Sequence, residues 1–402
     1  MREILSPLSE AETAEAIRDA RASRRPIVIE GGGTRSGLGR PVAADRILST
    51  RRLNGITLYE PAELVISARA GTPLAEIEAT LRARKQRLAF EPMDHRALFG
   101  TDGAPTIGAV AACNISGPRR IQAGAARDHL IGLRLVNGLG EIVKSGGRVM
   151  KNVTGLDLVK LSCGAYGTLG VLTEVTFKVL PEPETAATLA LHGLDDSKAI
   201  AALSAGLASP FQITGAADLP AGLESPEAEA LTLLRLEGAP ASVDYRCGAL
   251  TKLLAPFGTA EVLAPERAAK LWHEVRDVLP LAMPREAAIW RLSVAPSRGA
   301  EVVEVVKQRL SARYFYDWGG GLIWLSVAAE GDAGAAVVRE VLAEAGGKEG
   351  GHATLIRAAE EVRGRVNVFQ PLAAPLMQIS QGIKASFDPD HIVNPGRMYA
   401  GI

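Results

Sequence analysis

The sequence predicts an α+β protein with two lobes, and two observations carry this prediction. With 402 residues the chain is longer than a single hydrophobic core usually supports, so two domains are expected. The first half alternates short apolar strands with glycine-rich loops, whereas longer helices alternate with strands after the proline-rich stretch 181–184. We therefore expect a second lobe in which helices cover a largely antiparallel sheet.

The first half begins with a helix and continues with short strands. Ser9 and Glu12 have the spacing of a capping box, and the apolar residues after them keep helical spacing to about Ser23. Thr72-Pro73 opens a second helix, because proline is favoured at the first helical position. Gly138-Leu139-Gly140 separates two strands and is typical of a hairpin. The expected strands are 26–29, 46–50, 56–59, 64–68, 131–137, 141–145 and 171–180; the expected helices are 9–23, 72–84 and 107–115, with a long loop over 91–105.

The second half follows the linker Pro181-Glu182-Pro183-Glu184, where two prolines prevent a helix. Its expected strands are 188–191, 231–236, 289–294 and 322–327, and its expected helices are 196–207, 243–254, 266–279, 302–310, 335–345 and 374–385. We expect domains at 1–183 and 184–370, followed by a C-terminal segment, 371–402, that returns to the first domain.

The charge and cysteine content exclude several classes of partner. Lys+Arg and Asp+Glu are equal at 45 each, so there is no electrostatic case for nucleic acid or an anionic membrane surface. Three cysteines are too few for a disulfide framework or for an iron–sulfur cluster, which needs about four thiolates. There is no run of roughly 18 apolar residues and no apolar core of a signal peptide. We expect a cytoplasmic protein, with attachment at the inner membrane only through partner subunits.

A glycine-rich loop over 31–39 follows the first expected strand. Successive backbone N–H groups around a concavity bind phosphate without any side-chain charge. The loop is neither a P-loop, which needs Gly-Lys-Ser/Thr, nor a Gly-x-Gly-x-x-Gly turn leading into a helix. An ordinary strand–loop connection is the alternative for this segment.

A second candidate segment, 106–117, starts a helix with small residues along one face. Free amides at a helix N-terminus favour an anion, whereas close packing of helix on sheet through Gly108, Ala109 and Ala112 is the alternative. Arg119 and Arg120 follow directly; an isolated arginine pair is usually solvated, but here it could neutralise a phosphate or carboxylate.

A third segment makes the set specific. Met150-Lys151-Asn152-Val153-Thr154-Gly155-Leu156-Asp157-Leu158 runs into a second glycine turn at 164–170, and the chain ends in Asn394-Pro395-Gly396-Arg397-Met398-Tyr399. In this order and spacing, the segments resemble the vanillyl-alcohol oxidase and para-cresol methylhydroxylase (PCMH-type) flavoproteins. Within that superfamily the chain is most similar to the FAD-binding subunits of bacterial glycolate oxidase, over nearly its whole length. Leu156 and Ala165 replace the family's usual Tyr and Ser, and neither change removes a backbone contact.

The resemblance implies a PCMH-type FAD-binding domain with an α+β cap domain, and it assigns roles to particular residues. The glycine loop would wrap the FAD pyrophosphate, the second segment would line the flavin, the later turn would hold the adenosine end, and the C-terminus would cover the isoalloxazine. The implied cofactor-binding residues are Gly31, Gly32, Gly33, Thr34, Arg35, Ser36, Pro92, Asp94, Thr106, Ile107, Gly108, Ala112, Ser116, Gly117, Lys151, Gly164, Gly167, Gly170, Val171, Asn394 and Arg397.

The resemblance also implies how the flavin is held and what the second lobe lacks. Gly33 occupies the place of the histidine that tethers the flavin in many relatives, so noncovalent FAD is expected. Relatives that oxidise 2-hydroxy acids at their own flavin usually carry clustered histidines in the cap. Here His192, His273 and His352 are far apart without metal-ligand spacing, so no metal site is expected. His352 and His95 are the histidines whose neighbours favour a functional site, although a lone histidine is more often structural.

The resemblance favours an FAD-dependent oxidoreductase subunit that oxidises glycolate to glyoxylate together with a catalytic flavoprotein subunit and an iron–sulfur subunit. Arg119, Arg120 and His352 are the candidate catalytic residues. Two alternatives stay open. One is a self-sufficient FAD-dependent 2-hydroxy acid dehydrogenase; the other is a structural subunit that keeps the fold without turnover.

Overall fold

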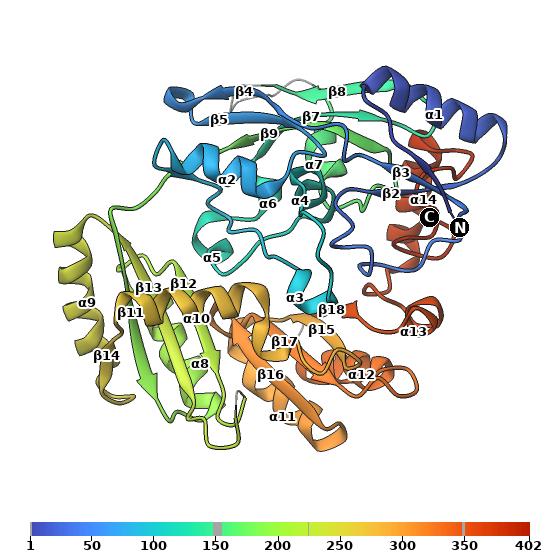
Figure 1. Ribbon diagram of the computed structural model, residues 1–402. Coiled ribbons are helices and arrows are strands. Elements are labelled where there is room, and N and C mark those ends of the chain that lie inside the picture. Colours follow the sequence, from blue (N-terminus) through green and yellow to red (C-terminus); the bar gives the residue numbers. More distant parts are fainter. Residues whose placement is uncertain (1, 148–154, 224, 348–349) are drawn as a thin grey trace.

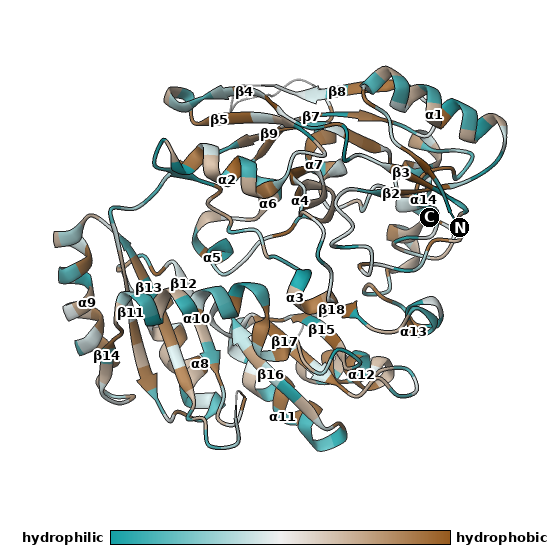
Figure 2. Cartoon of the chain, in the orientation of Figure 1, coloured by the Kyte–Doolittle hydropathy of each residue, from teal (hydrophilic) through white to brown (hydrophobic). Residues whose placement is uncertain are grey.

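The first lobe begins with the helix that the capping signal predicts. In this computed structural model, which describes residues 2–147, 155–223, 225–347 and 350–402, the Ser9 side chain accepts a hydrogen bond from the Glu12 amide, and helix α1 covers Glu10–Ala22. Ala14, Ile17 and Ala20 form its buried face, while its outer face is hydrophilic (Figure 2). The amphipathic pattern therefore sets which side of α1 packs on the sheets.

Three sheets build this lobe (Figure 1). A parallel sheet of order β1-β3-β2 carries the glycine loop at the end of β2, and a five-stranded antiparallel sheet has the order β4-β5-β9-β7-β8. The predicted hairpin is confirmed, because β7 pairs with β8. The strands are β1 (Glu3–Leu5), β2 (Ile27–Glu30), β3 (Arg46–Ser49), β4 (Ile56–Glu60), β5 (Val65–Arg69), β6 (Gln86–Arg87), β7 (Leu130–Val136), β8 (Ile142–Gly146), β9 (Val171–Lys178) and β10 (Leu180–Pro181), of which β6 and β10 pair with each other.

The helices of the first lobe are short and lie mainly between the sheets and the second lobe. The segment predicted as a loop over 91–105 contains one of them, α3, and two more follow the arginine pair. They are α2 (Leu74–Arg82), α3 (Arg96–Phe99), α4 (Ile107–Cys113), α5 (Arg120–Ala123), α6 (Ala126–His129) and α7 (Leu158–Ser162). Four-residue helices have too little periodicity to be read from a sequence.

The second lobe is one eight-stranded sheet of order β14-β11-β13-β12-β16-β17-β15-β18, with antiparallel pairing throughout its described part. This confirms the predicted fold class. Half of its strands, β12, β14, β16 and β18, were not predicted. The strands are β11 (Thr185–His192), β12 (Gly215–Leu219), β13 (Leu231–Gly238), β14 (Ala260–Val262), β15 (Ala288–Ser293), β16 (Ala312–Asp317), β17 (Leu322–Val327) and β18 (His352–Arg357). The helices are α8 (Asp196–Leu207), α9 (Pro240–Leu254), α10 (Pro265–Asp277), α11 (Gly299–Arg309) and α12 (Ala335–Ala345).

The two faces of this sheet have different partners. Trp290, Leu292 and Leu355 belong to a core shared with α8, α9, α11 and α12. Ile289, Trp324 and Ile356 point to the opposite face and share a core with the first lobe. Because side chains alternate along a strand, residues 289, 291 and 293 of β15 face the first lobe. The boundaries at residues 183 and 370 stay a prediction.

After α13 (Glu360–Arg365), the C-terminal segment returns to the first lobe through α14 (Ala374–Phe387), and both chain ends lie there (Figure 1). At the end of α14, Lys384 and Asp388 form an ion pair of 2.6 Å whose side chains are 1% and 0% exposed. The Lys384 ammonium also donates to the carbonyls of Thr168 and Val393, and Asp388 accepts from the amides of Ile392 and Val393. All three ammonium hydrogens are therefore used.

No helix in the described ranges is both long and apolar enough to cross a membrane.

Replacing Asp388 by Asn should destabilise the fold strongly, because it leaves the Lys384 ammonium buried without a counter-charge. Removing one partner of a buried pair costs about 3–5 kcal/mol. Urea unfolding followed by circular dichroism measures the change. The matched control is Lys198→Met, which removes an exposed (i, i+3) pair with Asp195 and should leave the midpoint unchanged. An Asp388→Asn variant that unfolds at the parent's midpoint would contradict this role.

Candidate functional site

A cavity of about 470 Å³ opens where the glycine loop, α4, the 166–172 turn and the C-terminal segment meet. This volume lies in the ~300–1,000 Å³ range of small-molecule sites. The sequence-predicted residues that line it are Gly31, Gly32, Gly33, Thr34, Arg35, Ser36, Gly108, Ala112, Gly167, Gly170, Asn394 and Arg397. The structure thus brings together residues from four segments that are far apart in the sequence.

The glycine loop presents a row of unpaired backbone donors. Within the described residues, no amide N–H of residues 31–37 donates to a protein acceptor, although the Leu38 amide beyond them does. Glycine is required here for space, since a Cβ on Gly31 would lie 2.4 Å from Thr106 Oγ1 and one on Gly32 would lie 1.6 Å from the Ala104 carbonyl oxygen. The loop therefore fits a phosphate held by main-chain amides.

Gly33 is required for its backbone conformation. Its φ is +79°, which disfavours any residue with a side chain, and an added Cβ would face Arg51 and Glu30 rather than the cavity. Arg51 in turn donates to the carbonyls of Gly31 and Gly32 and thereby stabilises the loop.

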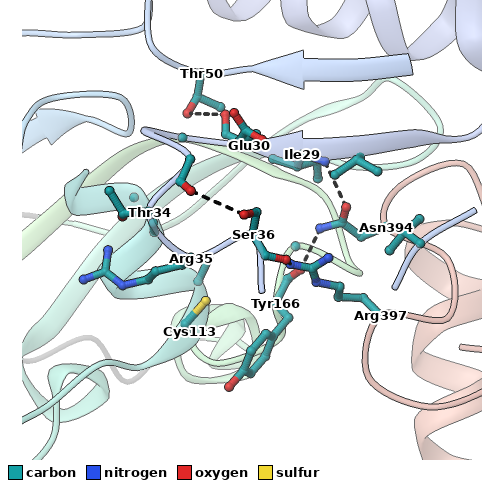
Figure 3. Close-up of a pocket in the computed structure, with 18 of the residues that line it drawn as sticks. Ile29, Glu30, Thr34, Arg35, Ser36, Thr50, Cys113, Tyr166, Asn394 and Arg397 are labelled. Carbon is teal, nitrogen blue, oxygen red and sulfur yellow. Dashed lines mark hydrogen bonds between the residues drawn. The ribbon is translucent and has the colours of Figure 1, made fainter. Parts of the chain in front are cut away.

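The C-terminal segment closes the cavity with two side chains (Figure 3). The Asn394 side-chain oxygen accepts from the Ile29 amide at 2.9 Å, and its nitrogen donates to the Tyr166 carbonyl at 2.8 Å. Arg397 donates to the carbonyl of Ser36. Gly167 is required beside them, because a Cβ there would lie 2.8 Å from the Asn394 side-chain nitrogen. Asn394 thus links strand β2 to the 166–172 turn.

Arg35 supplies a buried cation at the cavity wall. Its Nε donates to His95 Nδ1 at 3.3 Å and its Nη2 to the Met93 carbonyl at 2.9 Å, but its Nη1 is buried without a partner in the described residues. Burial first, and then the charge of Arg35, lowers the pKa of His95 to about 3, so His95 is a neutral acceptor. The unpaired amides fit a bound dianionic or polyanionic group such as the FAD pyrophosphate, and the buried Arg35 guanidinium adds positive charge at the cavity wall.

The start of α4 differs from the prediction. The amides of Ile107 and Gly108 donate to the carbonyls of Thr72 and Ala70, so they are not free for an anion. A Cβ on Gly108 would lie 2.5 Å from that of Ala70. Gly108 therefore serves close packing of the helix against the sheet, the alternative that the sequence left open, and it also lines the cavity.

The remaining predicted cofactor residues lie outside the cavity lining. The Ser116 hydroxyl accepts from the Ala126 amide, the Gly117 amide donates to the Phe90 carbonyl, and the Asp94 carboxylate accepts from Arg96. Residues that do not line the cavity are Pro92, Asp94, Thr106, Ile107, Ser116, Gly117, Gly164 and Val171, and Lys151 lies outside the described residues. Their roles stay predictions.

Arg119 lies in a buried ion pair between the lobes rather than at the cavity. It pairs with Glu237 of β13, which also accepts from Arg87 at 2.9 Å, and beside it Glu91 pairs with Arg235 at 2.8 Å. Burial lowers the pKa of Arg119 to about 9. This geometry fits an inter-lobe anchor, and a catalytic role for Arg119 stays a prediction.

Arg120 and His352 lie at a second place on the interface between the two lobes, which we call the seam. The guanidinium carbon of Arg120 is 4.7 Å from the centre of the Trp318 ring, and that of Arg291 is 5.1 Å from the same ring. Burial lowers the pKa of His352, and the charges of Arg291 and Arg120 lower it further. Arg291 was missed from the sequence, although an arginine inside the apolar strand 288–292 is an unusual placement and was the available signal.

Within the described ranges, no group of three or more His, Cys, Asp or Glu side chains has the arrangement of a metal site. Cys113 and Tyr166 line the cavity and were not predicted.

Comparison with known proteins agrees with the site. Residues 2–146 match the model of a family described as an FAD binding domain. The chain is 36% identical, over 96% of its length and 96% of the relative, to the glycolate oxidase subunit GlcE of Escherichia coli (strain K12). It is 26% identical, over 99% of its length and 88% of the relative, to the glycolate oxidase subunit GlcD of Bacillus subtilis (strain 168). The structure of p-cresol methylhydroxylase with substrate bound has a TM-score of 0.74 at 15% identity, covering 99% of this chain and 88% of the other, which confirms the predicted PCMH-type fold.

Replacing Gly33 by Val should lower the FAD content of the purified protein below about a tenth of the parent's, because the left-handed backbone of the loop cannot form. The flavin released from a known amount of protein measures this. The matched control is Gly222→Val, which meets the same strain at φ +75° in the second lobe with no neighbour within 4 Å of the added Cβ. Equal FAD in the Gly33→Val variant and the parent would show that the loop does not hold the cofactor.

His95 should make the fold sensitive to acid. A histidine whose pKa is lowered on folding contributes stability above its unfolded pKa of about 6.5, and this stability is lost as pH falls towards 3. At pH 5 the loss attributable to His95 is ~2 kcal/mol. Unfolding free energies at pH 7.5 and pH 5 should differ less in His95→Gln than in the parent by this amount. An identical pH dependence in the two proteins would contradict the neutral, buried state of His95.

Proposed function

Because the chain belongs to the GlcE family of FAD-binding glycolate oxidase subunits, we propose that it is the FAD-carrying subunit of a complex that oxidises glycolate to glyoxylate. The observation that carries the proposal is the similarity to the E. coli GlcE subunit along nearly the whole of both chains. The chain is an FAD-binding oxidoreductase, and its cavity has the donors that the cofactor needs. When bound, FAD accepts the electrons of the substrate.

The chain's own residues bind and orient the cofactor in this proposal. The amides of residues 31–37 hold the pyrophosphate, and Arg35 adds a fixed positive charge beside it. Asn394 and Arg397 hold the C-terminal segment over the cavity, which limits the access of water. A noncovalent FAD is supported by the described cavity lining, which contains no histidine that could form a covalent bond to the flavin. Acid precipitation should therefore leave the yellow colour in the supernatant.

The proposed partners are a catalytic flavoprotein subunit and an iron–sulfur subunit. The relatives named GlcE and GlcD are both subunits of glycolate oxidase, which supports a multi-subunit complex. The three cysteines of this chain, Cys113, Cys163 and Cys247, fall short of the roughly four thiolates of an iron–sulfur cluster, so the relay is assigned to another subunit. A self-sufficient dehydrogenase stays the alternative, and the cations Arg120 and Arg291 at the seam, with the neutral His352 beside them, are the observation that favours it.

Glycolate-dependent reduction of an artificial dye, measured on the purified chain and on the chain co-expressed with its partners, tests the proposal. The chain alone should be yellow with poor turnover, and the complex should be active. Robust turnover by the single chain would establish the self-sufficient alternative.

A complex assembled with the Gly33→Val variant separates a flavin role from a structural one. Loss of activity in that complex, with the Gly222→Val complex as active as the parent, supports an electron-carrying subunit. Full activity without FAD in this chain would make the subunit structural.

A further inference from the structure

We propose that the seam between the lobes holds a binding site for the carboxylate of a small 2-hydroxy acid, formed by Arg120, Arg291 and Trp318. This inference rests on the proposed function for the identity of the acid, and it adds that this chain itself contacts it. Two guanidinium groups of different lobes lie over one tryptophan ring, at 4.7 and 5.1 Å from its centre. Arginine presents a planar donor pair that matches a carboxylate.

In the described residues the two arginines have no acid partner, unlike three other arginines of the seam. Arg87, Arg119 and Arg235 are all paired with glutamates. In the described residues, the side chains of Arg120 and Arg291 have neither an ion pair nor a hydrogen bond to protein, although both are half-buried. A half-buried arginine without an acid partner favours the binding of an anion.

The carboxylates nearest to these arginines do not neutralise them. Burial lowers the pKa of Arg120, and Asp128, whose charge opposes this shift, already accepts a hydrogen bond from the Ala125 amide. Burial lowers the pKa of Arg291, and the charge of Asp317 opposes this shift. The Asp317 carboxylate accepts a hydrogen bond from the Trp318 amide, and burial raises the pKa of Asp317 to about 7. Neither forms an ion pair with the two arginines, so the positive charge is available to a ligand.

The strand register adds polar groups on the same face. Arg291 and Ser293 of β15 pair with Thr354 and His352 of β18, and paired residues of antiparallel strands project to one side. This side faces the first lobe, and Ile289, two residues before Arg291, packs in the core shared with that lobe. Two hydroxyls and a histidine therefore lie on the sheet face that carries Arg291, and they could receive the hydroxyl of a 2-hydroxy acid.

The site is close to the cofactor cavity. Trp318 and Tyr166 pack against the same hydrophobic core. Tyr166 lines the cavity, and His95 accepts from Arg35, which also lines it. Trp318 is held against the first lobe, because its indole N–H donates to the Gly117 carbonyl at 3.2 Å. An acid held by the two arginines would thus lie on the cap side of the cavity wall.

Calorimetric titration of the FAD-loaded chain with oxalate, a dicarboxylate with no hydrogen on carbon to lose, tests the site without turnover. The parent should bind oxalate, and oxamide, its neutral analogue, should not bind. Arg291→Gln and Arg120→Gln should each raise the Kd for oxalate at least tenfold, and Arg291→Lys should give an intermediate value. Arg309→Gln, which removes an arginine paired with Glu340 and Glu344 on the surface, is the matched control and should bind as the parent does.

Flavin content and thermal stability, measured on the same proteins, show that the variants are folded and loaded. No oxalate binding by the loaded parent, or unchanged Kd values in both Gln variants, would overturn the inference. Glycolate oxidation by the co-expressed complex is measured separately. If the complex is active but the chain does not bind oxalate, the proposed function is retained and the proposed carboxylate site is rejected.

Discussion

The buried pair of Lys384 and Asp388 is the constraint on which the rest of the site depends. Its remaining hydrogen bonds are with backbone groups of two other segments, so it fixes the end of α14, the turn that contains Thr168, and the strand-like segment 392–394 in one arrangement. A buried pair contributes little net stability compared with apolar packing, but breaking it is costly, so it specifies one position for the segment. That position places Asn394 against Ile29 and Tyr166, and Arg397 against Ser36.

The same logic of fixed polar groups runs through the seam between the lobes. Glutamates on both sides are matched by arginines, and Trp318 donates across the seam to the Gly117 carbonyl. These contacts let the cap sheet turn an apolar face towards the first lobe without leaving buried charges unpaired. Arg35 at the cavity and Arg120 and Arg291 at the seam have no acid partner in the described residues, and this makes them candidates for binding an anionic ligand.

Sequence reasoning succeeds here where a signal is local. The capping residues of α1, the hairpin of β7 and β8, and the glycine loop each depend on a few neighbouring residues, and each is found where predicted. It fails where long-range contacts decide. The free amides expected at Ile107 and Gly108 are occupied by the carbonyls of Thr72 and Ala70, and the pairing of Arg119 with Glu237 joins residues of different lobes. Arg291 becomes a candidate only when the register of β15 shows which face it takes.

The central claim is that one cavity, closed by the glycine loop and the returning C-terminal segment, holds the FAD. Hydrogen–deuterium exchange of the flavin-free chain, with and without added FAD, tests it most directly, because the amides of residues 31–37 have no protein acceptor in the described structure. The account predicts that FAD slows exchange in both 31–37 and 392–397. Unchanged exchange in these two segments, with FAD protecting another part of the chain, would contradict it.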